Sequence, residues 1–123
     1  MPSVSLPYPP TVNTYWMRCR HGMTLSPKAR EYRDVAAGEL RDLRESERIS
    51  KPVGVRVHLT AFMPDARTRD IDNILKPLFD AMTHAGAWDD DSQIDDLRVI
   101  RGGIDRDDPR VEIHWERIGV CDV

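Results

Sequence analysis

The chain has 123 residues, of which 40% are hydrophobic and 32% charged, enough for one domain with its own core. No apolar run approaches the roughly 20 residues of a membrane-spanning helix, and the N-terminal residues lack the pattern of an export signal. The net charge of −3 argues against a generic nucleic-acid binder, which usually carries a basic excess. Without an export signal, Cys19 and Cys121 are expected to be free thiols in a cytoplasmic protein.

The first residues predict a strand followed by an irregular segment. Residues 4–8 alternate apolar and polar side chains, and Pro7 places this short strand at a sheet edge or at its own end. Residues 14–23 mix aromatic and basic side chains with no clear period. This mixture suits contacts with a nucleic acid, and it equally suits a surface loop whose Tyr15 and Trp16 cap the core.

A helix is predicted to begin with Ser26 as its N-cap and Pro27 at the first helical position. Apolar residues then recur at helical spacing, and the helix is expected to end in the polar run 45–50. Its basic positions form a solvated face, with phosphate contact as the alternative. Residues 53–63 alternate over their whole length, which predicts the longest strand and a central place in the sheet.

A second helix is predicted over residues 71–84, with an apolar stripe facing the sheet. Pro77 has no backbone donor, so it should kink this helix or delay its regular start. Residues 93–101 and 110–118 predict two more strands. The order β-α-β-α-β-β indicates one α/β (α+β) domain over residues 1–123, a mixed sheet with two main helices that ends in a hairpin.

Two acidic clusters flank the second predicted helix. Asp70 and Asp72 lie one residue apart at its start, and residues 89–91 are three aspartates that open the next strand. If the chain folds back so that the clusters meet, their charges repel strongly, and a hard cation such as Mg²⁺ would relieve the repulsion. The pattern therefore predicts a divalent-metal phosphodiesterase site.

Each part of this pattern also has an ordinary structural explanation. Aspartate is favoured at helix N-termini, and Asp72 and Lys76 are spaced for a surface ion pair. A run of three aspartates is usually a solvated turn. Other site types do not match, since a calcium loop starting at Asp89 would need glycine and glutamate where Ile94 and Ile100 stand. No zinc, catalytic-triad or glycine-rich phosphate-loop spacing is present.

Six short motifs follow one another along the chain: Leu6-Pro7-x-Pro9-Pro10-Thr11-x-Asn13, Leu25-Ser26, Arg69-Asp70-Ile71-Asp72-Asn73-Ile74-Leu75-Lys76, Phe79-Asp80-Ala81, Gly86-x-Trp88 and Asp90-Asp91-Ser92-Gln93-Ile94. In this order and spacing they resemble the RusA family of Holliday-junction resolvases over nearly the whole chain. The D-x-D-N-x-x-K motif followed by D-D-S-Q is specific, whereas either half alone would be weak.

The resemblance implies a RusA-like homodimeric endonuclease, dependent on Mg²⁺ or on Mn²⁺ in its place, that cuts four-way DNA junctions symmetrically. The three metal-binding aspartates of the family match Asp70, Asp72 and Asp91, and its essential lysine matches Lys76. The metal would polarise the phosphate and activate water, while Lys76 stabilises developing charge or orients the nucleophile. This chain departs from the family at Asp89, where an apolar residue is more usual.

Basic and polar side chains near the motif and in the first third of the chain are candidates for DNA contacts: Arg67, Arg69, Asn73, Arg18, Arg20 and Lys28. Paired cuts in a two-fold symmetric junction need two active sites, which favours a C2 dimer. Two alternatives stay open. One is a metal-dependent nuclease acting on other branched DNA or on nucleotides, and the other is a non-catalytic junction-binding module.

Overall fold

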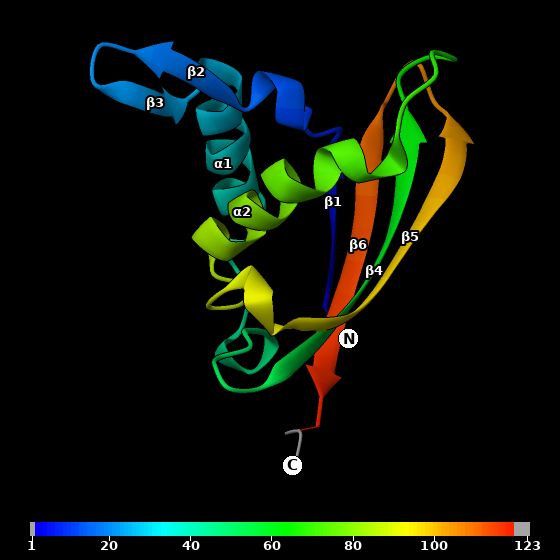
Figure 1. Ribbon diagram of the computed structural model, residues 1–123. Helices are drawn as coiled ribbons and strands as arrows, with labels where there is room; N and C mark the ends of the chain where they lie inside the picture. Colours follow the sequence, from blue (N-terminus) through cyan, green and yellow to red (C-terminus); the bar gives the residue numbers. More distant parts are fainter. Residues whose placement is uncertain (1, 120–123) are drawn as a thin grey trace.

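One four-stranded mixed sheet carries two helices on one of its faces (Figure 1). The computed structural model describes residues 2–119. The helices are α1 (Pro27–Glu39) and α2 (Leu75–Ala85), with short 3₁₀ helices η1 (Val12–Thr14), η2 (Glu45–Glu47), η3 (Ile71–Ile74) and η4 (Asp91–Gln93). The strands are β1 (Ser3–Pro7), β2 (Trp16–Cys19), β3 (Gly22–Leu25), β4 (Gly54–Met63), β5 (Ile94–Ile104) and β6 (Arg110–Ile118). No helix within residues 2–119 is long and apolar enough to cross a membrane.

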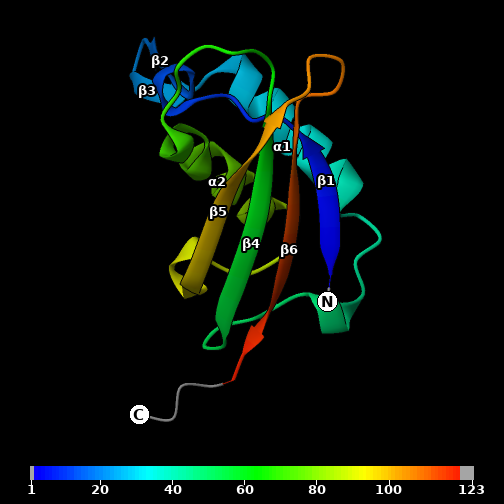
Figure 2. The same cartoon turned by 90° about the vertical axis from the view of Figure 1, so that its right-hand side faces the viewer.

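β4 is the central strand, as its alternating pattern predicts, but the prediction that it is the longest is wrong, because β5 has 11 residues and β4 has 10. It pairs in parallel with β5 and antiparallel with β6, and β1 completes the sheet in the order β1-β6-β4-β5. Val55, Val57 and Leu59 of β4 point into the core and are at most 2% exposed. No helix of residues 2–119 covers the opposite face (Figure 2). There Arg56 bridges the three strands through ion pairs with Asp96 and Glu116.

The predicted hairpin at the end of the sheet is wrong, because β5 and β6 lie on opposite sides of β4. The helical crossover through α2 delivers β5 parallel to β4, so the chain must pass over the end of β4 to start β6. The backbone N–H of Asp105 donates to the Met63 carbonyl, at 2.9 Å, where this passage begins. β1 lies at a sheet edge, as Pro7 predicts.

The two helices confirm the predicted starts but not the first predicted end. The Ser26 hydroxyl accepts the backbone N–H of Ala29, so α1 begins with the expected cap. α1 already ends at Glu39, close to Gly38, and not in the polar run 45–50. In the second helix, residues 71–74 form a 3₁₀ turn and regular α-helix starts at Leu75, so Pro77 delays the start as predicted.

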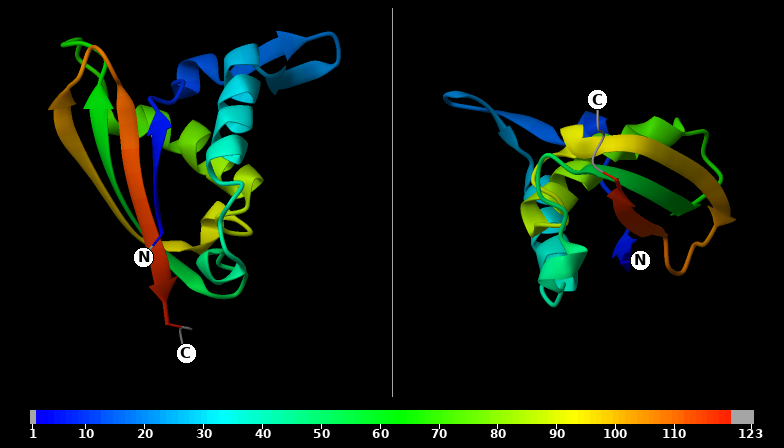
Figure 3. Two further views of the ribbon diagram at one scale, coloured as in Figure 1. Left: turned by 180° about the vertical axis from the view of Figure 1, so that it is seen from behind. Right: turned by 90° about the horizontal axis from the view of Figure 1, so that it is seen from below.

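The aromatic and basic segment 14–23 forms the hairpin β2–β3 and not a loop. Figure 3 shows this hairpin extending away from the sheet and both helices. Every β2 residue is exposed, which explains why the segment has no apolar period. Tyr15, just before β2, is buried and caps the core, whereas Trp16 is 50% exposed. Cys19 is a free, exposed thiol, and Cys121 lies outside the described residues.

A single guanidinium joins the C-terminal ends of both helices. Arg48 donates to the carbonyls of Ala85 and Gly86 at the end of α2, at 3.0 and 2.9 Å, and to Leu40 at the end of α1, at 3.3 Å. These carbonyls have no partner inside their helices, and their partial negative charge attracts a cation. Gly86 adopts a φ of +89°, and a Cβ at this position would collide with Arg48.

We expect Arg48→Met to lower the free energy of unfolding by about 2 kcal/mol, since it removes charged hydrogen bonds to three carbonyls. Urea unfolding followed by tryptophan fluorescence measures this. Arg41→Met, an exposed arginine just beyond α1, is the matched control and should change stability by less than about 0.5 kcal/mol. Equal losses for the two variants would show that Arg48 does not hold the helix ends.

Candidate active site

The first acidic pair lies at the end of the loop that follows β4. Asp70 immediately precedes η3 and Asp72 lies within it, and both residues are exposed. The Asp70 side chain makes no capping hydrogen bond, although its carbonyl accepts the Asn73 N–H at 3.2 Å. Helix capping, the ordinary explanation for an aspartate here, therefore does not account for the Asp70 carboxylate.

Arg69 fixes the loop that delivers this pair. Its guanidinium forms an ion pair with Asp65 at 2.7 Å, and the Arg69 carbonyl accepts a hydrogen bond from Arg101 of β5. The hydrogen bond from Arg69 lowers the pKa of Asp65 to about 2. The loop is thus tied both to itself and to the neighbouring strand just before Asp70.

The second acidic cluster folds back onto α2. η4 packs against this helix, so Asp91 comes within electrostatic range of Lys76 and Asp80 on the first turns of α2. Burial is the main cause that raises the pKa of Asp91, followed by its hydrogen bond with Asp90, while Lys76 lowers it. Asp90 behaves in the opposite way, because the Ser92 N–H and then Lys51 lower its pKa to about 2.

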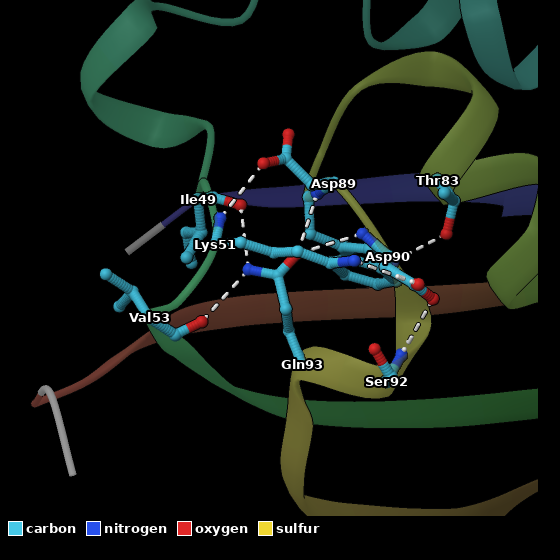
Figure 4. Close-up of polar contacts among 9 residues, drawn as sticks. Ile49, Lys51, Val53, Thr83, Asp89, Asp90, Ser92 and Gln93 are labelled. Atoms are coloured by element: carbon cyan, nitrogen blue, oxygen red, sulfur yellow. Dashed lines mark hydrogen bonds and ion pairs between the residues drawn. The ribbon is translucent and has the colours of Figure 1, made fainter.

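The side-chain amide of Gln93 is buried and holds in place the turn of residues 89–91, called the acidic turn below (Figure 4). Its Oε1 accepts the backbone N–H groups of Asp89 and Asp90, at 2.9 and 2.8 Å. Its Nε2 donates to the carbonyls of Ile49 and Val53, at 3.1 and 2.9 Å. The side chain is only 7% exposed, so these four bonds fully satisfy a polar group that would be costly to bury unpaired.

Lys76 pairs with Asp80 one turn further along α2. The Lys76 ammonium lies 3.1 Å from Asp80 Oδ1, so Lys76 is paired with the aspartate four residues after it and not with Asp72, four residues before it. Asp80 Oδ2 accepts the Tyr15 hydroxyl at 2.5 Å. Burial raises the pKa of Tyr15, and the hydrogen bond to Asp80 raises it further. Lys76, Asp80 and Asp91 thus form one charged cluster, with Tyr15 beneath it.

The structure does not assemble a closed metal cage. Within residues 2–119, no three acidic, histidine or cysteine side chains lie close enough together to hold a metal ion. The shared pocket of Asp70, Asp72 and Asp91 therefore stays a prediction. The fold does bring Asp91 within electrostatic range of Lys76, because η4 packs against α2.

The predicted DNA-contacting side chains lie in four places. Arg18 and Arg20 are exposed on the hairpin, and Lys28 is exposed in the first turn of α1. Arg67 has a side chain 83% exposed at the loop after β4, whereas that of Arg69 is only 17% exposed because of its pairing with Asp65. Asn73 is half-buried in η3. Their contacts with DNA stay predictions.

Comparison with known proteins places these features in an enzyme class. Residues 7–116 match the family model described as "Endodeoxyribonuclease RusA". The crossover junction endodeoxyribonuclease rusA of Enterobacteria phage HK97 is 45% identical over 97 residues, 79% of each chain. The protein of that name from Escherichia coli K12 is 38% identical over 99 residues, 80% of this chain and 81% of the relative. The Enterobacteria phage 82 protein is 38% identical over 98 residues, 80% of each chain.

The family match and these relatives thus identify the chain as an endodeoxyribonuclease, an enzyme that hydrolyses DNA. The chain belongs to the RusA endodeoxyribonuclease family, as its motifs suggest. Nucleases of this family are metal-dependent.

Three residues of the site are not among the predicted functional residues. Gln93 occurs within a quoted motif, but only the fold shows that it anchors the acidic turn. Asp80 is four residues after Lys76, a spacing that signals an ion pair, yet Asp72 has the same spacing on the other side. Tyr15 donates a hydrogen bond to Asp80 although the two are 65 residues apart in sequence, and no local sequence pattern predicts that contact.

We expect Gln93→Leu to lower the free energy of unfolding by about 2–4 kcal/mol and to reduce DNA cleavage. The reason is that two backbone N–H groups and two backbone carbonyls lose their hydrogen-bond partner. Urea unfolding and a cleavage assay measure the two effects. Ser92→Ala, an exposed neighbour in the same turn, is the control and should leave both unchanged. Wild-type stability of Gln93→Leu would contradict the anchoring role.

Proposed function

We propose that this protein cuts four-way DNA junctions by paired, symmetric nicks, acting as a homodimer with Mg²⁺. By homology it is a crossover junction endodeoxyribonuclease, a Holliday-junction resolvase. The proposal adds which of its own residues do the work. The observation that supports it is the packing of η4 against α2, which leaves Asp91 within electrostatic range of Lys76.

The carboxylates suit a hard divalent cation. Asp70, Asp72 and Asp91 offer oxygen ligands on exposed or half-exposed elements, and Mg²⁺ commonly takes one or two carboxylates together with water and substrate phosphate. Burial and neighbouring carboxylates oppose the negative charge of Asp91, so a cation beside it would be favourable. Bound there, the ion would polarise the scissile phosphate and lower the pKa of an attacking water.

Besides the metal ion, the proposed active site has a positive charge from the protein itself, the Lys76 ammonium. Its ammonium carries three donors, and one faces Asp80. The side chain is 54% exposed, so the remaining donors can reach an incoming phosphate. We assign to Lys76 the stabilisation of negative charge that develops on the phosphoryl oxygens, or the orientation of the nucleophile.

The β2–β3 hairpin is proposed as an arm that grips the junction. It combines Arg18 and Arg20 with the half-exposed Trp16, and aromatic rings beside basic groups suit unpaired bases and phosphates near a branch point. Arg67 offers a further exposed charge beside the acidic loop. This local distribution of basic groups permits DNA binding in spite of a net charge of −3.

Two active sites related by a two-fold axis match the two-fold symmetry of a four-way junction. A homodimer would thus place one acidic crossover on each of two opposite strands, and both strands could be cut within one encounter.

We expect the purified protein to nick an immobile four-way junction in pairs with Mg²⁺, and EDTA to stop it. Asp72→Asn should cut at least about 100-fold more slowly, and Lys76→Ala should lose turnover more than junction binding. Asp107→Asn, an exposed aspartate in the β5–β6 turn, is the charge-matched control. Equal cutting of linear duplex would point to a general nuclease, and binding without cutting would point to a junction-binding module.

For the hairpin, we expect Arg18→Ala with Arg20→Ala to weaken junction binding about tenfold at 100 mM salt, since two phosphate contacts are lost. The slope of log K against log salt should fall by nearly two. Binding is measured by fluorescence anisotropy in Ca²⁺, so that no cutting occurs. Arg41→Ala, exposed beyond α1, should bind as the wild type; an unchanged slope in the double variant would argue against the arm.

A further inference from the structure

We infer that Asp80 is a positioning residue, which holds the Lys76 ammonium beside Asp91 and is itself held by Tyr15. The inference rests on the catalytic role proposed above for Lys76. It concerns the contacts that fix a flexible lysine at the site, and these lie wholly within this chain.

The geometry gives each oxygen of Asp80 its own partner. Oδ1 lies 3.1 Å from the Lys76 ammonium, and Oδ2 accepts the Tyr15 hydroxyl at 2.5 Å. The Asp80 side chain is 20% exposed and that of Lys76 is 54% exposed, so the carboxylate is the better fixed of the two. With both oxygens engaged, Asp80 is better placed to support Lys76 than to serve as a metal ligand.

Tyr15 is a firm anchor for this carboxylate. The residue is only 2% exposed, and its carbonyl accepts the backbone N–H of Ser26, the N-cap of α1, at 2.9 Å. Ser26 also donates its hydroxyl to the Thr14 carbonyl at 2.6 Å. The base of the hairpin is therefore fixed to the start of α1 at the point where the Tyr15 hydroxyl reaches across to α2.

A lysine side chain has four rotatable bonds, and a fixed partner reduces the arrangements it samples. Asp91 lies within electrostatic range of both Lys76 and Asp80, and without the Asp80 contact the ammonium would be free to turn away into solvent. Asp80 would thus keep Lys76 facing the phosphate. The contact through Tyr15 would also link the hairpin arm to the catalytic lysine.

The test is a double-mutant cycle. Single-turnover cleavage of a four-way junction in Mg²⁺ is measured for the wild type, Asp80→Asn, Lys76→Ala and the double variant. We expect Asp80→Asn to slow cleavage about tenfold when Lys76 is present and less than about twofold when it is absent. Junction binding in Ca²⁺ should stay within about twofold. Asp96→Asn, which removes a carboxylate from another ion pair, is the matched control.

A spectroscopic readout keeps the inference testable even if Lys76→Ala cuts no DNA. The chain has three lysines, Lys28, Lys51 and Lys76, so reductive methylation with ¹³C-formaldehyde gives one signal for each lysine beside that of the N-terminal amine. In Asp80→Asn and in Tyr15→Phe, the Lys76 signal should move while the other two stay in place. Tyr15→Phe removes one hydroxyl and keeps the ring, so it serves where Asp80→Asn folds poorly.

The outcomes separate the two proposals. Wild-type cleavage by Lys76→Ala would overturn the role of Lys76, and with it the proposed mechanism. An inactive Lys76→Ala beside a fully active Asp80→Asn would leave that mechanism intact and overturn the positioning role. Equal slowing by Asp80→Asn on both backgrounds, or an unmoved Lys76 signal, would also overturn it, because Asp80 would then act independently of the lysine.

Discussion

The site depends on one buried amide. Gln93 joins the backbone of the acidic turn to the backbone of the segment before β4, and it does so with all four of its hydrogen-bonding positions filled. Three adjacent aspartates repel one another, and Gln93, together with the ion pair between Lys51 and Asp90, keeps the turn that carries them from opening into solvent. The neutral amide of Gln93 bonds only backbone groups of this turn, which leaves the carboxylate of Asp91 available for a cation.

Much of the site could be predicted from sequence because its chemistry is local. Asp70, Asp72 and Lys76 occur within one short motif, and Asp91 follows at a fixed spacing. The contacts that organise these residues are not local: Tyr15 reaches Asp80 and Gln93 reaches Ile49 across 65 and 44 residues. A sequence shows that such side chains are polar, but not that they are buried and paired, which is decided by packing.

In the fold, too, local features could be predicted from the sequence and long-range contacts could not. Period and capping residues correctly predict the central β4, the start of α1 at Ser26 and the delayed start of α2 before Pro77. The end of α1 could not be predicted, because Arg48 caps it together with the end of α2 from outside both helices. Strand order also escaped prediction, since β5 and β6 are neighbours in sequence but each prefers β4 as its partner.

β6 is the last of the strands within residues 2–119, yet it lies between β1 and β4. Leu6 of β1 therefore finds its partner, Val111, 105 residues later (111 − 6). Contacts of such long sequence separation make folding slow and cooperative. During synthesis, a chain that ends before β6 lacks both the support for β1 and the buried Trp115. A ribosome-bound intermediate would thus be unable to close its core, and DNA-cutting activity is expected to arise only after β6 has left the ribosomal exit tunnel.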